Sequence, residues 1–190
     1  LVSTATVGSK SVTVDCGESH REVTIIVVEA TELTITGATE GNPEDTWYAA
    51  KGEGYVTATV TLNPTVNPSD MPSDVVDWSG DGEPIDALTR RISKGTAGEY
   101  TLTASCGTWS ETRTVRIMEI VWLDVSGASQ GMMNWDHYYA PKSPTAVVTL
   151  TLWTYPYVED GDLPEGIITW SGDVDGEDQL TRTMSCAATG

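Results

Sequence analysis

One acidic turn near the end of the chain carries residues suited to cation binding. Residues 173–178 read Asp-Val-Asp-Gly-Glu-Asp and place four carboxylates around a glycine. Hard oxygen ligands at alternate positions are what Ca²⁺ coordination requires, although the bidentate Glu of a twelfth position does not follow. Asp173, Asp175, Glu177 and Asp178 are therefore the candidate metal ligands. The alternative is a solvated acidic loop that only keeps the protein in solution.

Aromatic residues in two loops could bind sugars. Aromatic faces can form a glycan-stacking platform, or they can pack a loop onto the edge of a sheet. We keep both interpretations for these two loops. The residues in corresponding places are Trp47 and Tyr48 in the first loop, and Trp135, His137, Tyr138 and Tyr139 in the second.

The chain lacks the residue sets that catalysis needs. An active site requires a nucleophile with its base, paired carboxylates in a cleft, or a metal with an open coordination position. His20 and His137 are the only histidines. No Ser-His-Asp order, phosphate-binding glycine loop or His-metal spacing can be assembled from the rest. We therefore expect a protein that is not an enzyme, with no catalytic residues and no certain cofactor apart from the candidate Ca²⁺.

The net charge and the apolar runs exclude two classes of partner. The chain carries 28 acidic and ten basic side chains, for a formal charge of −18. This charge repels phosphate backbones and anionic lipids, so we expect no nucleic-acid partner. The longest apolar run, residues 25–28, is far below the ~18 residues of a membrane span, so we expect no membrane insertion. Apolar residues make up 39% of the chain, enough to bury a core in a folded protein.

The elements that position these residues are predicted to be β-strands. Thr and Val are abundant, Gly and Pro recur at short intervals, and no convincing helix pattern is present. Alternation of apolar residues with Thr indicates antiparallel strands that face water on one side. The fold class is therefore all-β. We expect strands near residues 31–37, 55–62, 74–78, 87–93, 98–106 and 111–119.

The sequence contains an internal repeat of about 90 residues. Residues 70–81 return without a gap as residues 162–173, so that Trp78 and Trp170 lie 92 positions apart. A second block, residues 16–38, matches residues 106–128 at an offset of 90. Tyr155-Pro156-Tyr157 has no aromatic counterpart in the first repeat and could mark a local interface.

A strand-rich repeat of this length, with frequent turns, is typical of an immunoglobulin-like sandwich of two sheets. Trp78 and Trp170 each precede a Ser-Gly-Asp turn, where an indole could fill the middle of the core. With Tyr100, they are the expected structural core residues.

These motifs also point to a family. The segments Val-Val-Asp-Trp-Ser-Gly at 75–80, Leu-Thr-Arg-Arg-Ile-Ser at 88–93 and Gly-Glu-Tyr-Thr-Leu-Thr-Ala at 98–104 resemble the bacterial immunoglobulin-like repeats of large surface or secreted proteins. The resemblance implies tandem antiparallel β-sandwiches of about 90 residues each, in an extracellular or cell-surface protein.

The phase of the repeat predicts three segments. Residues 1–30 are expected to be the last strands of a preceding repeat, residues 31–119 a complete repeat, and residues 120–190 a repeat that lacks its last two strands. The chain starts without Met, as a mature or excised piece of a longer protein would.

The incomplete ends predict the partners. Residues 9–29 correspond to the strands that 120–190 lacks, and an open sheet edge is a template for pairing. The expected partners are neighbouring repeats or identical subunits, through strands 9–29 and the open edge of 120–190. Identical subunits would assemble head to tail into a filament by strand donation. In either case we expect residues 9–29 to lie against sandwich strands.

The alignment of the repeats predicts no disulfide within one chain among the three cysteines. Cys16 and Cys106 occupy the same place in successive repeats, too far apart for the ~7 Å Cα separation that a disulfide allows. Cys186 falls in a different loop. We expect three free thiols in the monomer.

The leading functional hypothesis is a structural segment of a stalk, fibre or adhesin shaft in a large acidic extracellular protein. The junction at 117–123 lacks Gly, Pro and Ser, so we expect little hinge freedom. The alternative is a β-sandwich module that binds a carbohydrate or another host ligand.

Overall fold

The computed structural model describes residues 6–133, 136–143 and 145–187, and its architecture is all-β, as predicted. Two short 3₁₀ turns, η1 (Pro68–Asp70) and η2 (Asp160–Asp162), interrupt the strands of the described chain. The chain divides into two compact units. The first unit comprises Leu1–Gly37, Tyr55–Ser93 and Tyr100–Arg113, and the second comprises Ala38–Gly54, Lys94–Glu99 and Thr114–Gly190. The repeat boundaries expected at residues 30 and 119 stay a prediction.

One sheet of the first unit is antiparallel and has four strands in the order β3-β6-β9-β8. These strands are β3 (Glu29–Thr36), β6 (Tyr55–Asn63), β8 (Glu83–Pro84) and β9 (Thr89–Ser93). In β6 the residues Val56, Ala58, Val60 and Leu62 are buried, whereas the residues between them are exposed or half-buried. Successive side chains of a strand point to opposite faces, so the Val-Thr-Ala-Thr alternation builds one apolar face.

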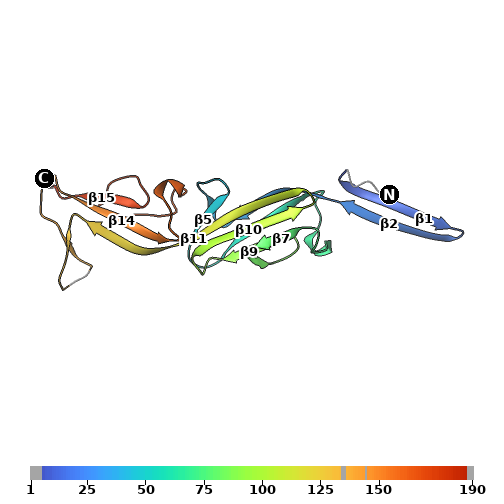
Figure 1. The fold of residues 1–190 in the computed structure, drawn as a ribbon, viewed down its shortest axis with the longest axis horizontal. Helices are drawn as coiled ribbons and strands as arrows, with labels where there is room; N and C mark the ends of the chain where they lie inside the picture. The colour runs from blue at the N-terminus through green and yellow to red at the C-terminus, as the bar shows by residue number, and fades with distance from the viewer. Residues whose placement is uncertain (1–5, 134–135, 144, 188–190) are drawn as a thin grey trace. The chain divides into compact units, whose positions relative to one another are not determined.

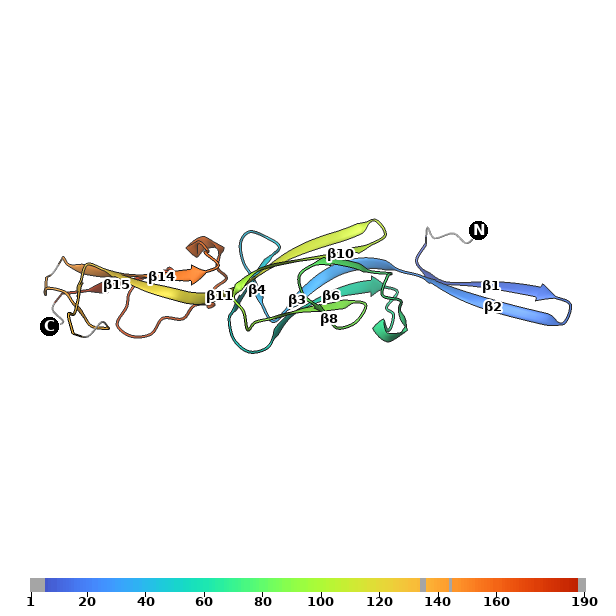
Figure 2. The same ribbon diagram turned by 60° about the horizontal axis from the view of Figure 1, so that its bottom comes forward.

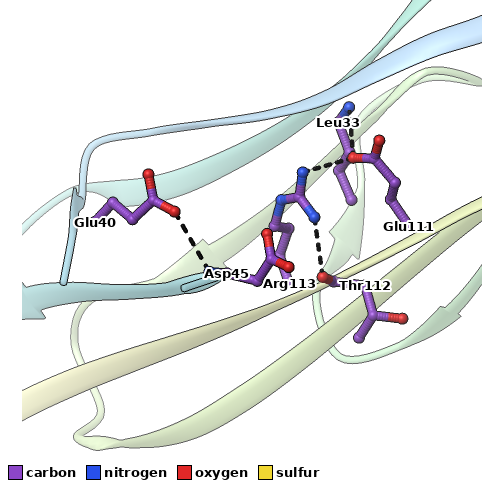
Figure 3. Close-up of polar contacts among 6 residues, drawn as sticks. All are labelled: Leu33, Glu40, Asp45, Glu111, Thr112 and Arg113. Atoms are coloured by element: carbon purple, nitrogen blue, oxygen red, sulfur yellow. Dashed lines mark hydrogen bonds and ion pairs between the residues drawn. The ribbon is translucent and has the colours of Figure 1, made fainter. Parts of the chain in front are cut away.

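Opposite this sheet, the first unit contains β7 (Asp77–Gly80) paired antiparallel with β10 (Gly98–Cys106) (Figure 1). Leu102 and Ala104 of β10 are fully buried. Glu111 of the next strand links the two sheets, because its carboxylate accepts a 3.3 Å hydrogen bond from the backbone N–H of Leu33 in β3. Arg113 donates to the same carboxylate at 2.5 Å (Figure 3). The first unit is thus a two-sheet sandwich around an apolar core.

The strand β11 (Trp109–Ser126) is 18 residues long and runs from the first unit into the second. In the second unit it pairs in parallel with β5 (Thr46–Ala50) and then antiparallel with β14 (Val147–Tyr155). The strand β15 (Thr181–Ser185) continues this sheet beyond β14 (Figure 2). Three short strands complete the unit: β4 (Thr39–Glu40), β12 (Ser129–Gln130) and β13 (Tyr138–Tyr139).

At the N-terminal end, β1 (Gly8–Cys16) and β2 (Ser19–Val27) form a hairpin that is paired along its whole length. Gly17 opens its two-residue turn with a left-handed φ of +61°, which is the usual requirement at that position. Within the described residues, neither strand pairs with any other strand. The expectation that residues 9–29 lie against sandwich strands of a neighbouring repeat or subunit stays a prediction, because it concerns strands outside this chain.

The six strands expected between residues 31 and 119 are all present, with shifted ends. The strand expected at 74–78 begins at Asp77, and the strand expected at 111–119 extends to Ser126. The strands β4, β5 and β8 were not predicted from the sequence. The described residues include no helix long and apolar enough to cross a membrane.

Candidate functional site

The second unit carries an exposed group of aromatic residues on the outer face of the β11–β14 pair. Trp122 lies directly opposite Trp153 in the antiparallel register, and their exposed fractions are 61% and 51%. The rings of Trp153 and Tyr157 lie 6.5 Å apart, tilted by 40°. We call this group the aromatic patch. It consists of Trp122, Trp153, Tyr155 and Tyr157.

The fold does not require this patch. Positions 32, 61, 63 and 65 of the first repeat correspond to it, and all four residues there, Glu32, Thr61, Asn63 and Thr65, are exposed and polar. Because the same scaffold forms with polar residues at these positions, the aromatic rings are not needed for packing. Contiguous exposed apolar surface of this kind marks an interaction site.

A shallow pocket of about 250 Å³ adjoins the patch. Its lining includes Trp153 and Tyr157 together with the acidic residues Glu159 and Asp160. One carboxylate oxygen of Asp160 accepts a 2.6 Å hydrogen bond from the backbone N–H of Leu180, which holds that side chain in place. Ring faces beside carboxylate acceptors suit a ligand that has both apolar faces and hydroxyl donors.

Sequence reasoning named Tyr155 and Tyr157 but missed Trp122 and Trp153. The signal that could have found them is the comparison of the two repeats. A change from Glu32 to Trp122 and from Thr61 to Trp153, at outward positions of an alternating strand, has no packing explanation.

The first of the two predicted aromatic loops is a strand. Trp47 and Tyr48 belong to β5, and Tyr48 is only 1% exposed. Its hydroxyl donates a 2.7 Å hydrogen bond to the carbonyl of Asn42 and accepts one of 3.3 Å from Arg116. Burial raises the pKa of the Tyr48 hydroxyl. Tyr48 thus takes the edge-packing role that we kept as one interpretation, and it cannot stack on a sugar.

The second predicted loop remains open to solvent. Tyr138 and Tyr139 form β13 and pair with β12, just as Trp47 and Tyr48 pair with β4. Tyr139 is 66% exposed, although it corresponds to the buried Tyr48. His137 is also exposed, whereas Trp135 lies outside the described residues.

Trp78, Trp170 and Tyr100 are half-buried, so the expectation that they fill the middle of the core needs correction. In the core of the first unit, the fully buried positions belong to smaller residues such as Leu33, Val60 and Leu102. Each Trp instead closes a loop. The indole N–H of Trp78 donates to the carbonyl of Ala87 at 3.2 Å, and that of Trp170 donates to Gln179 at 2.7 Å. An indole with a polar N–H packs well at such a boundary.

The candidate calcium ligands do not assemble into a site. In the part of the chain that the structure describes, no three His, Cys, Asp or Glu side chains gather closely enough to hold a metal ion. Asp173, Asp175, Glu177 and Asp178 are all exposed. The backbone of Asp175 pairs with Thr183, which turns the loop back onto β15. The described residues therefore give no geometric support for calcium binding at this turn.

The cysteines agree with the sequence expectation. Cys16, Cys106 and Cys186 are all free, and Cys16 in the hairpin turn is exposed. Thiol titration of the unfolded, unreduced monomer should find three sulfhydryls.

A tight cluster within the second unit joins β5 and β11 to the segments that follow β14. Tyr48, Met118, Val158 and Leu163 form its buried centre. A Cβ added at Gly41 would clash with the carbonyl oxygen of Asp162 and lie 2.6 Å from the Tyr48 ring, so glycine is required there. Lys51 also forms an ion pair with Glu119 of β11. We call this set of contacts the junction cluster.

A long apolar groove lies open on the second unit. Its volume is about 840 Å³. Residues that should form the core of a sandwich line it, including Leu123, Val125, Val148, Leu150 and Met184. Leu123 is 42% exposed, whereas its counterpart Leu33 in the first repeat is 2% exposed. The described residues of the second repeat therefore leave its sandwich core open on this side.

Comparison with known proteins adds little to this picture. No protein-family model matches the chain, so the resemblance to bacterial immunoglobulin-like repeats stays a prediction. No curated protein matches it either. One solved structure that it is similar to is "Drosophila OTK, extracellular domains 3-5", with 14% sequence identity and a TM-score of 0.26. The alignment covers 94% of this chain and 61% of that structure.

Proposed function

We propose that this chain is a semi-rigid structural segment of an extracellular or cell-surface protein, built from tandem immunoglobulin-like sandwiches. Its role is to space other parts of the protein, as in a stalk, fibre or adhesin shaft, and it performs no catalysis. The resemblance of the repeat motifs supports the location, and the acidic surface suits a solvated shaft.

The observation that carries this proposal is the continuity of β11. Residues 114–118 pair with β5 as the last strand of one repeat, and residues 119–126 pair with β14 as the first strand of the next. No linker separates these two parts of β11, so the backbone hydrogen bonds continue through the point where a hinge would lie. The junction cluster then covers this point with Tyr48, Met118 and Leu163. A flexible linker has neither feature.

Distance measurements across the junction test the proposal. Spin labels at Glu44→Cys and Glu177→Cys, both exposed positions of the second unit, would report its internal freedom in a chain whose native cysteines are Ser. We expect a narrow distance distribution. Insertion of Gly-Ser-Gly-Ser between Glu119 and Ile120 is the matched control and should broaden it. A native distribution as broad as that of the insertion variant would contradict a semi-rigid spacer.

A second candidate function is carbohydrate binding, which the aromatic patch and its adjoining acidic pocket favour. Stacking on Trp153 and Tyr157 would orient a sugar, and the carboxylates of Glu159 and Asp160 would accept hydrogen bonds from its hydroxyl groups. Binding to a glycan array tests this function. Trp153→Ala and Tyr157→Ala should remove the binding, whereas Thr61→Ala at the corresponding position of the first repeat should keep it. Binding that survives both aromatic substitutions would exclude the patch as the site.

A further inference from the structure

We propose that the open groove of the second unit binds the β1–β2 hairpin of a second copy of this chain, and that the hairpin completes the unclosed sandwich. The inference shares the repeat architecture with the proposed function but does not depend on a spacer role. It joins two surfaces that the structure leaves without partners.

The first surface is the apolar face of the hairpin. Cross-strand partners such as Val12 and Val23 place their side chains on the same face. Val14 and Ile25 of that face are exposed in the described chain. A two-stranded hairpin in water is only marginally stable, so this face requires a cover.

The second surface is the segment 169–172. In the first unit, Trp78-Ser79-Gly80 forms the strand β7 because it pairs with β10. The same residues recur as Trp170-Ser171-Gly172, but the structure assigns no strand to them. Strand formation requires hydrogen bonds to a neighbour, and no counterpart of β10 lies against this segment in the described residues.

Two glycines show that this segment has the shape to receive a strand. Gly80 and Gly172 have similar left-handed φ values of +89° and +102°. A Cβ added at Gly80 would clash with the carbonyl oxygen of Thr101 in β10, whereas one added at Gly172 would meet no atom of the described residues within 4 Å, its chain neighbours aside. Glycine at position 172 thus keeps clear the space that a strand occupies in the first unit.

Asp81 identifies a further contact that the second repeat can make. Its carboxylate accepts a 2.7 Å hydrogen bond from the N–H of Thr101, and its own N–H donates to the carbonyl of Thr101 at 2.7 Å. Asp173 is the counterpart of Asp81, and Ser11 of β1 is the counterpart of Thr101. We therefore assign Asp173, first considered as a metal ligand, to holding the incoming strand.

The hairpin β1–β2 is the occupant that matches this groove. The strands β1 and β10 are both nine residues long, start at Gly and end at Cys, and lie 90 positions apart. Their turn glycines, Gly17 and Gly107, have φ values of +61° and +62°. The pairing of β10 with β7 then transfers directly: Thr13 is expected opposite Ser171, and Val14 opposite Trp170.

Charge also favours the hairpin. Residues 8–27 carry two basic and three acidic side chains, so the hairpin is almost neutral in a chain whose formal charge is −18. In hairpin docking, the segment of one copy that meets the acidic second copy is therefore nearly uncharged, so electrostatic repulsion at the contact is small. Because the rest of the two copies still repel each other, added salt should strengthen the association.

Cross-linking between differently marked chains tests the inference. One full-length chain carries Thr13→Cys and the other Ser171→Cys, with all native cysteines replaced by Ser in both. Mild oxidation of the mixture should give a disulfide-linked heterodimer in high yield. The control replaces Thr13→Cys with Val12→Cys, whose side chain points to the other face, and should give at least about tenfold less. Equal yields from the two mixtures, or none from either, would overturn the proposal.

Substitutions distinguish hairpin docking from nonspecific hydrophobic association. Light scattering measures the association of the variants. Val14→Asp should weaken association by about 100-fold or more, because the carboxylate would be buried without a partner. Thr13→Asp adds the same charge to the outward face and should weaken it far less. Asp173→Ala should weaken association about tenfold, whereas Asp178→Ala in the same acidic turn should not.

The result is also independent of the spacer test. The spin-label distances are measured on dilute monomers and within one unit, so they can be narrow whether or not copies associate. A wild-type chain that stays monomeric at roughly millimolar concentration and high salt would overturn hairpin docking and leave the spacer intact.

Discussion

The guanidinium of Arg116 joins the buried hydroxyl of Tyr48 to the carboxylate of Glu99. Arg116 donates hydrogen bonds to the Tyr48 hydroxyl at 3.3 Å and to Glu99 at 2.8 Å, and the Tyr48 hydroxyl donates one to the carbonyl of Asn42 at 2.7 Å. These hydrogen bonds fix the ring on which Met118 and Leu163 pack. The Tyr48 ring of the junction cluster is therefore held by a short chain of hydrogen bonds in an apolar setting.

Substitution of Tyr48 should separate this polar contact from the packing. Tyr48→Phe keeps the ring and removes the hydroxyl, so we expect a loss of about 1 kcal/mol of unfolding free energy. Tyr48→Ala also leaves a cavity and should cost about 3–5 kcal/mol. Denaturant unfolding measures both. Tyr139→Phe and Tyr139→Ala, at the exposed counterpart, should change stability by less than about 0.5 kcal/mol.

The same residue predicts a loss of stability in alkali. Burial raises the pKa of Tyr48 above its ordinary value of 10.0, so above that pH the unfolded chain loses this proton before the folded chain does. Stability from this group is complete below pH 10 and falls as the pH rises through the raised pKa. Urea midpoints between about pH 8 and 11 should fall more steeply for the native chain than for Tyr48→Phe. Parallel curves would contradict the assignment.

The two loop-closing tryptophans give a matched pair of substitutions. Trp78→Phe and Trp170→Phe each keep an aromatic ring and remove an indole N–H that donates to a backbone carbonyl. We expect each to lower unfolding free energy by about 1 kcal/mol, because the carbonyl loses its donor. Trp153→Phe in the exposed aromatic patch is the control and should have almost no effect. A cost for Trp153→Phe as large as for the others would show that the patch is packed.

Calcium should not stabilise this chain. The carboxylates of Asp173, Asp175 and Glu177 do not gather into a metal site, so we expect equal melting temperatures in calcium and in excess chelator. A site occupied at 100 times its dissociation constant would instead add about 2.7 kcal/mol. A rise of that size would restore the metal interpretation of the acidic turn.

Much of the fold was predictable because its signals are local. Alternation in 55–63 and 98–106 marked β6 and β10, and Cys-Gly at 16–17 and 106–107 marked two equivalent turns. The parallel pairing of β5 with β11 was not predictable, since it joins segments about 70 residues apart and no local pattern encodes the partner. The aromatic patch was only partly predictable. Its residues are visible in the sequence, but the face they share is set by the register of β11 against β14.

The sequence by itself determined the repeat, its all-β character and the correspondence of each residue in one copy to a residue in the other. Only the tertiary structure decided what each copy became. Trp-Ser-Gly is a strand at 78–80 and not at 170–172, and a tyrosine is buried at 48 and exposed at 139. The physical reason is that a strand and a core position exist only when a distant segment supplies hydrogen bonds and cover. In the first copy β10 and β11 supply them, and in the second that place is open.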